Sequence, residues 1–236
     1  MEIKGSIAFS FVDWDGRVSS VFFLPYCNFR CPFCHNVTLV LHPEKEETTP
    51  IEQVETCLNQ RQGWIDGVCI TGGEPTLHSD LPDLCSKIKR LGFSVKVDTN
   101  GTNPVLVKEL IEKELVDYIA LDIKAPLTVE KYSRVTGIDA EKLLGKVKET
   151  VETLLRSRVD YEFRTTVVPT LHVKKDIEKI CRSIKGCKKY VLQKFDVSLG
   201  KETLNPDFNR LKPFTDVEMR TFQTIAKKFL PNTKLR

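Results

Sequence analysis

Short apolar segments alternate with amphipathic segments along almost the whole chain, and this alternation limits the possible folds. Apolar runs bounded by turn residues predict strands, and apolar residues every three or four positions predict helices. The predicted strands are Val18–Leu24, Asp66–Thr71, Phe93–Thr99, Val116–Lys124, Asp160–Val168 and Lys189–Phe195. A predicted helix follows each of them, which indicates a parallel sheet with helices on its outside.

The number of strand–helix units limits the kind of sheet further. Eight units close a full barrel in about 250 residues, whereas this chain of 236 residues has six predicted strands. We therefore predict an α/β fold in which a partial, open (β/α)6 barrel forms a single domain over residues 1–236. No Pro-, Gly- or Ser-rich linker and no repeat of fixed period indicates a second domain.

Particular residues predict where some helices begin and end. Thr49 and Glu52 have the spacing of a capping box at a helix start, and so do Thr215 and Glu218 before the last helix. Gly92 follows an amphipathic segment and is placed to end that helix.

Polar residues gather just after the predicted strands. In sheets of this type, functional side chains lie at the carboxyl ends of the strands. The segments concerned are the cysteine-rich loop after the first strand, Thr71–Leu77, Asp98–Gly101, Leu121–Lys124, Arg164 and Gln193–Pro206. Their convergence on one rim predicts a functional site there.

Three of the chain's eight cysteines, Cys27, Cys31 and Cys34, have the spacing CxxxCxxC. Structural zinc normally takes four closed ligands; His35 is a conceivable fourth, but adjacent side chains such as those of Cys34 and His35 often point apart. An iron–sulfur cluster normally takes four cysteines, so three leave one iron with an open position. Open metal positions bind substrates or cofactors. Loop cysteines that bind no metal are a third interpretation.

The other cysteines are scattered over predicted strands and helices. They are Cys57, Cys69, Cys85, Cys181 and Cys187. We interpret most of them as small core residues. We do not expect a disulfide between the last two, because the cytosol is reducing.

The net charge of +4 is mildly basic, with local basic runs at Lys185–Lys189 and Ala226–Arg236. Solvated surface is the simplest interpretation of these runs, and docking to an acidic protein or nucleic acid is the alternative. Few aromatics lie among them, so they do not favour nucleic-acid binding. The N-terminus lacks the pattern of a signal peptide, and no long apolar window occurs. We predict a cytoplasmic protein without a membrane span.

The cysteine spacing on a loop after the first strand resembles the radical S-adenosylmethionine (SAM) superfamily. The resemblance implies a barrel of the radical SAM type, with one [4Fe–4S] cluster held by Cys27, Cys31 and Cys34. It implies that the fourth iron binds the amino and carboxylate groups of SAM. Phe33 matches the aromatic residue that packs near the adenine in this superfamily.

The segment GGEP after the second strand also matches the superfamily. The two glycines, Gly72 and Gly73, allow a close approach of the backbone to a ligand, and their carbonyls can receive the ammonium of SAM. Glu74 can accept a charge-assisted hydrogen bond from the same ammonium. A plain strand-to-helix turn is the alternative interpretation.

The stretch PYCNFRCPFCHN resembles the signature of glycyl radical enzyme activating enzymes, with the pair His35 and Asn36 after the last cysteine. Asn36 is accordingly expected to lie among the cofactor-binding residues, while Val37 replaces the usual proline. Among these enzymes, the short activating proteins of anaerobic ribonucleoside-triphosphate reductase are the most similar. Two features depart from the pattern: VDWDG replaces a tyrosine–proline–glycine stretch, and no histidine follows LQKF on the last strand.

The resemblance implies further site residues at the ends of later strands. Asp98, Thr99 and Asp122 would hold a monovalent cation, Na⁺ or K⁺, beside the carboxylate of SAM, and Thr99 would also belong to the cofactor site. Lys124 would reach the cofactor, and Arg164 would face its carboxylate. A helix cap for the first aspartate and a surface ion pair for the lysine are the alternatives.

The function implied by the resemblance is reductive cleavage of SAM at the cluster. The resulting 5′-deoxyadenosyl radical would take a glycine Cα hydrogen from a partner glycyl radical enzyme, of the anaerobic ribonucleotide reductase or pyruvate formate-lyase type. A flavodoxin or ferredoxin would donate the electron. One alternative is a radical SAM enzyme acting on a small molecule or nucleotide, similar to 7-carboxy-7-deazaguanine synthase. A second is an iron–sulfur module without catalysis.

Overall fold

The computed structural model describes residues 2–197 and 202–236. The chain divides into two compact units, which are described separately. The first consists of Met1–Asn28, Thr38–Thr99 and Val105–Ile119, and the second of Phe29–Val37, Asn100–Pro104 and Ala120–Arg236. Residues Ser198–Lys201, part of the predicted segment after the last strand, lie outside the described residues.

The first unit contains a sheet of four complete strands. They are β1 (Gly5–Ser10), β2 (Ser19–Leu24), β3 (Gly67–Gly72) and β4 (Ser94–Thr99). Strands β2, β3 and β4 are parallel, while β1 pairs with β2 in the antiparallel direction and is the edge strand. In register, Leu24 pairs with Gly72, so β2 and β3 end at the same level. The loops that follow these two strands therefore begin side by side.

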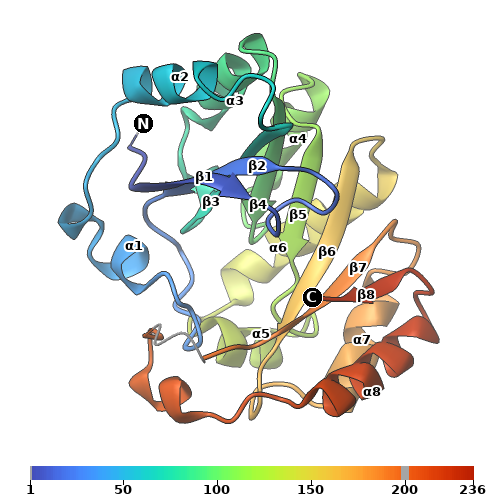
Figure 1. The fold of residues 1–236 in the computed structure, drawn as a ribbon. Coiled ribbons are helices and arrows are strands. Elements are labelled where there is room, and N and C mark those ends of the chain that lie inside the picture. Colours follow the sequence, from blue (N-terminus) through green and yellow to red (C-terminus); the bar gives the residue numbers. More distant parts are fainter. Residues whose placement is uncertain (1, 198–201) are drawn as a thin grey trace. The chain divides into compact units, whose positions relative to one another are not determined.

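The helical elements between Asn36 and Leu115 connect or flank these strands (Figure 1). They are α1 (Val37–Leu41), η1 (Pro43–Lys45), α2 (Ile51–Asn59), η2 (Pro75–Leu77), α3 (Leu81–Arg90) and α4 (Pro104–Glu112). Helix α3 shows why such a segment becomes a helix. Its buried residues Leu81, Leu84, Cys85 and Ile88 form one apolar stripe at helical spacing, and Gly92, with a φ of +86°, follows its end as predicted.

Strand β5 (Tyr118–Asp122) begins in the first unit and ends in the second. The second unit contains β6 (Asp160–Val167), β7 (Tyr190–Lys194) and β8 (Thr233–Leu235), which pair in parallel. Its helical elements are α5 (Val129–Thr136), α6 (Glu141–Arg156), α7 (Lys174–Ser183), η3 (Pro206–Arg210) and α8 (Asp216–Lys227). Helices α7 and α8 lie side by side next to strands β7 and β8 (Figure 1).

All six predicted strands are present, and the predicted α/β class with a mainly parallel sheet is confirmed. The capping box of Thr215 is also confirmed, because its backbone N–H donates to Glu218 Oε2 at 2.7 Å. The capping box predicted at Thr49 is wrong. Helix α2 begins at Ile51 with Pro50 as its N-cap, and Thr49 instead forms an antiparallel bridge with Ile3, which keeps its backbone extended.

The scattered cysteines lie mostly in the core, as predicted. Cys69, Cys85 and Cys181 are fully buried, whereas Cys57 and Cys187 are partly exposed. Cys181 and Cys187 are both thiols rather than a disulfide. None of the helices in the described part of the chain combines the length and apolar content of a bilayer-spanning helix.

Candidate active site

Gly72, the last residue of β3, and Gly73, which follows it, let this part of the chain pack against the backbone that precedes the first cysteine. Gly73 N donates to Leu24 O at 2.8 Å, and Glu74 N donates to Tyr26 O at 2.7 Å. A Cβ atom at Gly73 would lie only 1.8 Å from Tyr26 O, and Gly72 has a φ of +118°. Both positions therefore require glycine for contacts within the first unit, whatever they also bind.

His78 strengthens the same contact and was not singled out from the sequence. Its Nε2 atom lies 2.9 Å from Pro25 O, and its ring contacts that of Tyr26 with a centroid separation of 6.4 Å. Tyr26 itself has a φ of +62°, a conformation that few non-glycine residues adopt. The backbone that leads into the first cysteine is thus held by the GGEP segment itself and by His78, which follows that segment.

The buried carboxylate of Glu74 joins the ends of β3 and β4. Its Oε1 atom accepts hydrogen bonds from Thr76 N at 3.1 Å, Thr76 Oγ1 at 2.5 Å and Thr99 Oγ1 at 2.6 Å. Two of the predicted cofactor-binding residues, Glu74 and Thr99, are therefore in direct contact. Because Glu74 is only 1% exposed, it places a negative charge in a region from which water is largely excluded.

Asp98, one of the residues predicted to bind a cation, forms an ion pair with a lysine on the same strand. Lys96 Nζ lies 3.0 Å from Asp98 Oδ1. The lysine is 1% exposed, and its ammonium also donates to Asp13 O. Sequence reasoning missed Lys96, although its position two residues before Asp98 on a strand places both side chains on one face of the sheet.

In the second unit, the loop with the other two cysteines is a tight turn. Cys34 N donates to Cys31 O at 3.0 Å, while Leu204 N donates to Cys34 O at 3.0 Å and Asn205 N to Pro32 O at 2.9 Å. The segment after the last predicted strand is therefore bound to the cysteine loop by its backbone. The amide groups that hold this turn belong to residues far apart in sequence, so only the folded chain reveals them.

Aromatic rings pack beside this turn. The Phe33 ring lies edge-on to Phe195 at a centroid separation of 6.4 Å, and the His35 ring stacks on Phe195 at 5.6 Å with an interplanar angle of 15°. Phe195 belongs to LQKF at the end of β7. The aromatic residue of this segment thus positions two residues of the cysteine-rich stretch, Phe33 and His35.

Helix α5, which the sequence reasoning did not predict, holds the other side of the loop. Arg30 N donates to Thr136 O at 2.8 Å. Gly137 ends the helix with a φ of +69°, and a Cβ there would lie 2.2 Å from Arg30 O. The Phe29 ring packs edge-on against Tyr132 at 6.1 Å. The sequence signal was the glycine after an amphipathic segment.

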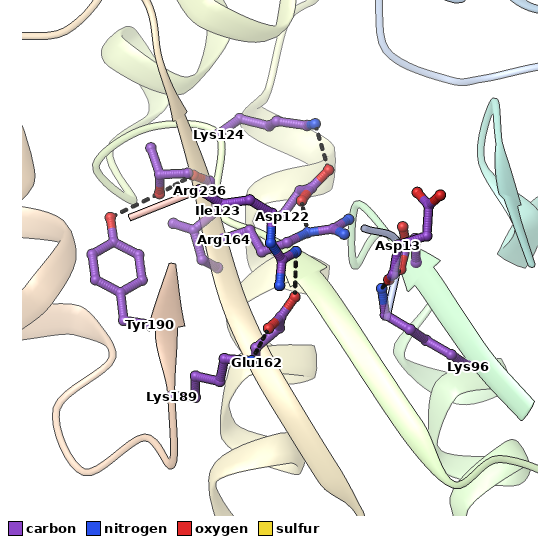
Figure 2. Close-up of polar contacts among 12 residues, drawn as sticks. Asp13, Lys96, Asp122, Ile123, Lys124, Glu162, Arg164, Lys189, Tyr190 and Arg236 are labelled. Atoms are coloured by element: carbon purple, nitrogen blue, oxygen red, sulfur yellow. Dashed lines mark hydrogen bonds and ion pairs between the residues drawn. The ribbon is translucent and has the colours of Figure 1, made fainter. Parts of the chain in front are cut away.

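Three residues predicted to act at the ends of β5 and β6 form one cluster, in which Arg164 is buried and Asp122 and Lys124 are partly exposed (Figure 2). Asp122 Oδ2 accepts from Lys124 Nζ at 2.8 Å, and Asp122 Oδ1 accepts from Arg164 Nε at 2.8 Å. Burial alone would raise the pKa of Asp122, but Arg164 and Lys124 hold it well below its usual value. Two cations and one anion leave the cluster with one excess positive charge.

Lys124 is also electrostatically coupled to the cysteine loop. Burial acts to lower the pKa of Lys124, but the negative charges of Asp122, Cys31 and Cys34 outweigh it and raise this pKa. Burial raises the pKa of the Cys34 thiol, while a backbone hydrogen bond from Asn36 and the charge of Lys124 act to lower it. Of the predicted residues in this unit, Asn36, Lys124 and the two cysteines thus belong to one electrostatic environment.

A buried carboxylate, that of Glu162, lies on β6 and forms an ion pair with a lysine of the basic run before β7 (Figure 2). Glu162 is 1% exposed and pairs with Lys189 Nζ at 2.8 Å and with a terminal nitrogen of Arg236 at 3.2 Å. Burial would raise its pKa, but the hydrogen bond from Lys189 and nearby arginines lower it. The neighbouring Lys188 donates to Val159 O at 2.8 Å. These lysines therefore have structural partners within the protein.

His172 holds the backbone at Lys124. Val168 N donates to His172 Nδ1 at 3.0 Å, so Nδ1 is the acceptor and the Nε2–H group donates to Lys124 O at 2.9 Å. The imidazole is 2% exposed, and burial is the main reason that its pKa is lowered. These two hydrogen bonds therefore fit the neutral imidazole of His172 with its proton on Nε2.

Replacement of His172 is expected to change how stability depends on pH. The unfolded chain takes up a proton near the ordinary pKa of 6.5, whereas the folded protein resists it, so wild-type stability should fall as the pH drops below 6.5. His172→Phe should lose this part of the pH dependence and about 1–3 kcal/mol of stability at pH 8, because Val168 N–H is left unsatisfied. Urea unfolding at pH 5, 6 and 8 measures both effects. An unchanged pH dependence in the variant would show that another group is responsible.

The three cysteines suit an iron–sulfur cluster by their chemistry. Thiolates are the ligands that iron–sulfur clusters take, and Cys31 and Cys34 lie on a turn whose backbone groups are bound by other segments. Cys27 belongs to the first unit. Among the described residues, no three His, Cys, Asp or Glu side chains are grouped as they would be around a single metal ion. In a [4Fe–4S] cluster each thiolate binds a different iron, so the three sulfurs do not meet at one metal.

Comparison with known proteins identifies the family. A model of the Radical SAM superfamily matches residues 21–184, which is more than half of the chain. The chain therefore belongs to the radical SAM superfamily and is an enzyme of this class. The prediction of the superfamily, of its fold type and of the enzyme class is confirmed.

Within the superfamily, two curated relatives show the range of similarity. The chain is 33% identical over 235 residues to a Methanocaldococcus jannaschii protein named "Putative glycyl-radical enzyme activating enzyme", and the match covers 99% of this chain and 95% of that protein. It is 26% identical over 218 residues to a "Probable GTP 3′,8-cyclase" of Methanococcus aeolicus, covering 89% of this chain and 69% of that protein.

Solved structures agree on the fold. Streptococcus suis SuiB bound to its precursor peptide SuiA matches with a TM-score of 0.70 at 14% identity, over 92% of this chain and 48% of SuiB. SuiB bound to SAM matches with a TM-score of 0.69 at 15% identity, over 92% and 51%. Archaeal TYW1 matches with a TM-score of 0.60 at 13% identity, over 89% and 72%. The chain thus spans about half the length of SuiB.

Proposed function

We propose that the protein is an activating enzyme for a glycyl radical enzyme. In this proposal a 5′-deoxyadenosyl radical, formed by reductive cleavage of SAM, takes a hydrogen atom from the Cα of one glycine in a partner protein. The observation that carries the proposal is the match to the Methanocaldococcus jannaschii protein named "Putative glycyl-radical enzyme activating enzyme", which extends over 99% of this chain and 95% of that relative. The partner is of the anaerobic ribonucleotide reductase or pyruvate formate-lyase type, and a flavodoxin or ferredoxin supplies the electron.

In this proposal Cys27, Cys31 and Cys34 hold one [4Fe–4S] cluster. When bound and reduced, the cluster supplies one electron to the sulfonium of SAM. Within the first unit, the loop after β3 binds the backbone before Cys27; within the second unit, α5 and the residues after β7 bind the loop that carries Cys31 and Cys34, so each part of the motif is held by its own unit. A rigid loop suits a cofactor whose open position must accept a second ligand.

Each unit has a charge that suits one end of the amino acid moiety of SAM. Glu74 places a buried negative charge beside the glycine carbonyls of Gly72 and Gly73, which suits an ammonium group. The cluster of Asp122, Lys124 and Arg164 has an excess positive charge, which suits a carboxylate. We propose Thr99, Phe33 and Asn36 as further cofactor-binding residues; Thr99 would act by orienting Glu74, to which it donates a hydrogen bond.

Replacement of Glu74 by glutamine tests the ammonium role. The amide oxygen can still accept from Thr76 and Thr99, but the negative charge is lost. SAM should bind roughly 10- to 100-fold more weakly, as expected for loss of a buried hydrogen bond to a charged group. Calorimetry on the reconstituted protein measures the affinity, with iron content as the control. Wild-type affinity in Glu74→Gln would contradict the assignment.

A nucleotide or other small-molecule substrate is the second candidate function. It is favoured by the match to a named GTP cyclase, which covers 89% of this chain. The match leaves about a third of that relative uncovered, since it extends over 69% of its length, whereas the activating enzyme is matched almost completely. We therefore place the protein-activating function first.

The experiment that separates these functions supplies each substrate to the same enzyme. The protein is reconstituted anaerobically with iron and sulfide, reduced, and given SAM with either a candidate glycyl radical enzyme or GTP. The proposal predicts a glycine radical signal in electron paramagnetic resonance with the protein partner. A product formed from GTP, without a glycine radical on any candidate partner from the same genome, would support the nucleotide function instead.

A further inference from the structure

Within the first unit, Lys96 and Asp98 form a buried ion pair on β4, the strand that ends at Thr99. The side chain of Lys96 is 1% exposed and that of Asp98 is 11% exposed, with 3.0 Å between Nζ and Oδ1. A cation–π contact to Tyr118 at 6.0 Å adds a further interaction for the ammonium. The carboxylate of Asp98 thus already has a monovalent cation beside it, and that cation is covalently part of the chain.

The balance of buried charge makes a second cation at Asp98 unnecessary. Among the described residues of the first unit, the charged residues that are buried are Glu74, Lys96 and Asp98, and the side chain of Lys4, which is 7% exposed, has its own partner in the exposed Glu2. Lys96 balances the carboxylate of Asp98. Under the proposed function the ammonium of SAM would pair with Glu74, whereas Na⁺ or K⁺ at Asp98 would place a second cation beside a buried carboxylate that already has one.

We propose that the ammonium of Lys96 takes the place of a bound monovalent cation at Asp98, so that SAM binding is independent of Na⁺ and K⁺. This inference rests on the proposed function only in its use of SAM as the ligand. It replaces the expectation, taken from family resemblance, that Asp98 helps to bind a metal ion. Asp122, the other carboxylate of that expectation, is likewise paired, with Lys124 and Arg164.

The unusual VDWDG segment provides the backbone oxygen that accepts a hydrogen bond from Lys96. Ser10 Oγ accepts from Asp13 N at 3.2 Å and donates to Asp13 Oδ2 at 2.5 Å, which folds the segment into a turn. This turn directs Asp13 O at the lysine ammonium (Figure 2). The VDWDG segment and the lysine on β4 are therefore parts of one arrangement.

Trp14 packs this turn against the sheet, beside Tyr118 on β5 and Gly67 on β3. Trp14 is 3% exposed, and its ring centroid lies 5.8 Å from that of Tyr118. The guanidinium of Arg17 lies over the Trp14 ring, 4.8 Å from its centroid. A Cβ atom at Gly67 would come within 2.8 Å of the Trp14 ring, so the start of β3 must be glycine to admit it. The position of Asp13 O, and with it that of the lysine, is thereby fixed by packing.

A salt series on the full-length reconstituted enzyme tests the inference. SAM affinity is measured by calorimetry at equal ionic strength in sodium, potassium and tetramethylammonium chloride, since the last cation is too large for a carboxylate site. The wild type should bind SAM with affinities within twofold of one another in the three salts. Lys96→Met should bind at least tenfold more weakly in tetramethylammonium and recover in sodium or potassium, because a small ion can then reach Asp98.

Lys113→Met is the matched control, because Lys113 is an exposed surface lysine on the same unit; its salt profile should equal that of the wild type. A wild-type affinity that rises tenfold or more with sodium or potassium would overturn the inference. So would a Lys96→Met variant with the profile of the wild type.

Rubidium diffraction gives a readout that needs neither SAM binding nor a folded variant. Wild-type crystals grown with Rb⁺ should show no anomalous peak beside Asp98, and a peak there would refute the role of Lys96. If the wild type binds no SAM in any salt, the proposed function fails, while the rubidium result still decides between lysine and metal ion.

Discussion

Replacing Cys31 with alanine is expected to abolish both cluster assembly and SAM cleavage. The thiolate is one of the three cysteine ligands that the superfamily uses, and a [4Fe–4S] cluster with only two cysteines is not expected to survive reconstitution. Iron content should fall to background, and 5′-deoxyadenosine formation should fall by at least about 1000-fold, or about 4 kcal/mol of transition-state stabilisation. Iron analysis and mass spectrometry of the reaction mixture measure the two effects.

Cys57→Ser is the control for this variant. Cys57 is partly exposed on α2, outside the cysteine loop, and we expect iron content and turnover close to those of the wild type. Full cleavage of SAM by Cys31→Ala would show that this cysteine is not a ligand of the catalytic cluster.

Gly73→Ala is expected to have the second largest effect, although it adds only one methyl group. The new Cβ would lie 1.8 Å from Tyr26 O, which is far inside van der Waals contact, so the loop after β3 or the backbone before the first cysteine must move. Displacement by about 1 Å of groups that position a reactant can cost roughly 100-fold in rate. We expect SAM cleavage to fall by at least that factor, with weaker SAM binding as well.

Gly145→Ala separates this steric effect from the general effect of adding a methyl group. Gly145 lies within α6, and a Cβ there would meet no atom within 4 Å. Alanine at a helix interior should stabilise the protein by roughly 0.5–1 kcal/mol and leave SAM cleavage unchanged. If Gly73→Ala cleaves SAM as fast as Gly145→Ala does, the close backbone contact is not needed for activity.

The regular elements and their order could be predicted from sequence because their signals are local. The parallel strands are short apolar runs, and helices such as α3 carry a complete apolar stripe. The capping box at Thr215 depends on residues three positions apart. The strand ends also gave the prediction of which polar residues form the site, since chain order alone places those ends at one edge of a parallel sheet; that part stays a prediction.

The features that sequence reasoning missed depend on contacts between distant segments. Thr49 has the local pattern of a helix cap, but its pairing with Ile3, remote in sequence, determines its conformation. Strand β8 has three residues and is defined by its pairing with β7 rather than by its own pattern. His78 and Lys96 become informative only when the backbone oxygens that they contact, Pro25 O and Asp13 O, are placed beside them.

Gly72 and Gly73 show a second reason why sequence alone is not sufficient. Their presence was predicted to serve the approach of a ligand, yet the structure gives them a role in the approach of one loop to another. Both roles require the absence of a side chain, so a sequence pattern cannot tell them apart. Glu74 similarly has structural partners, Thr76 and Thr99, which orient the carboxylate proposed to receive the SAM ammonium.

Deuterium transfer tests the central claim, hydrogen abstraction from a protein glycine, most directly. A candidate glycyl radical enzyme is produced with glycine deuterated at Cα and given to the reduced, reconstituted protein together with SAM. The account predicts 5′-deoxyadenosine carrying one deuterium, with a matching glycine radical on the partner. Abundant 5′-deoxyadenosine that stays unlabelled with every such partner, but gains deuterium from a labelled nucleotide, would contradict it.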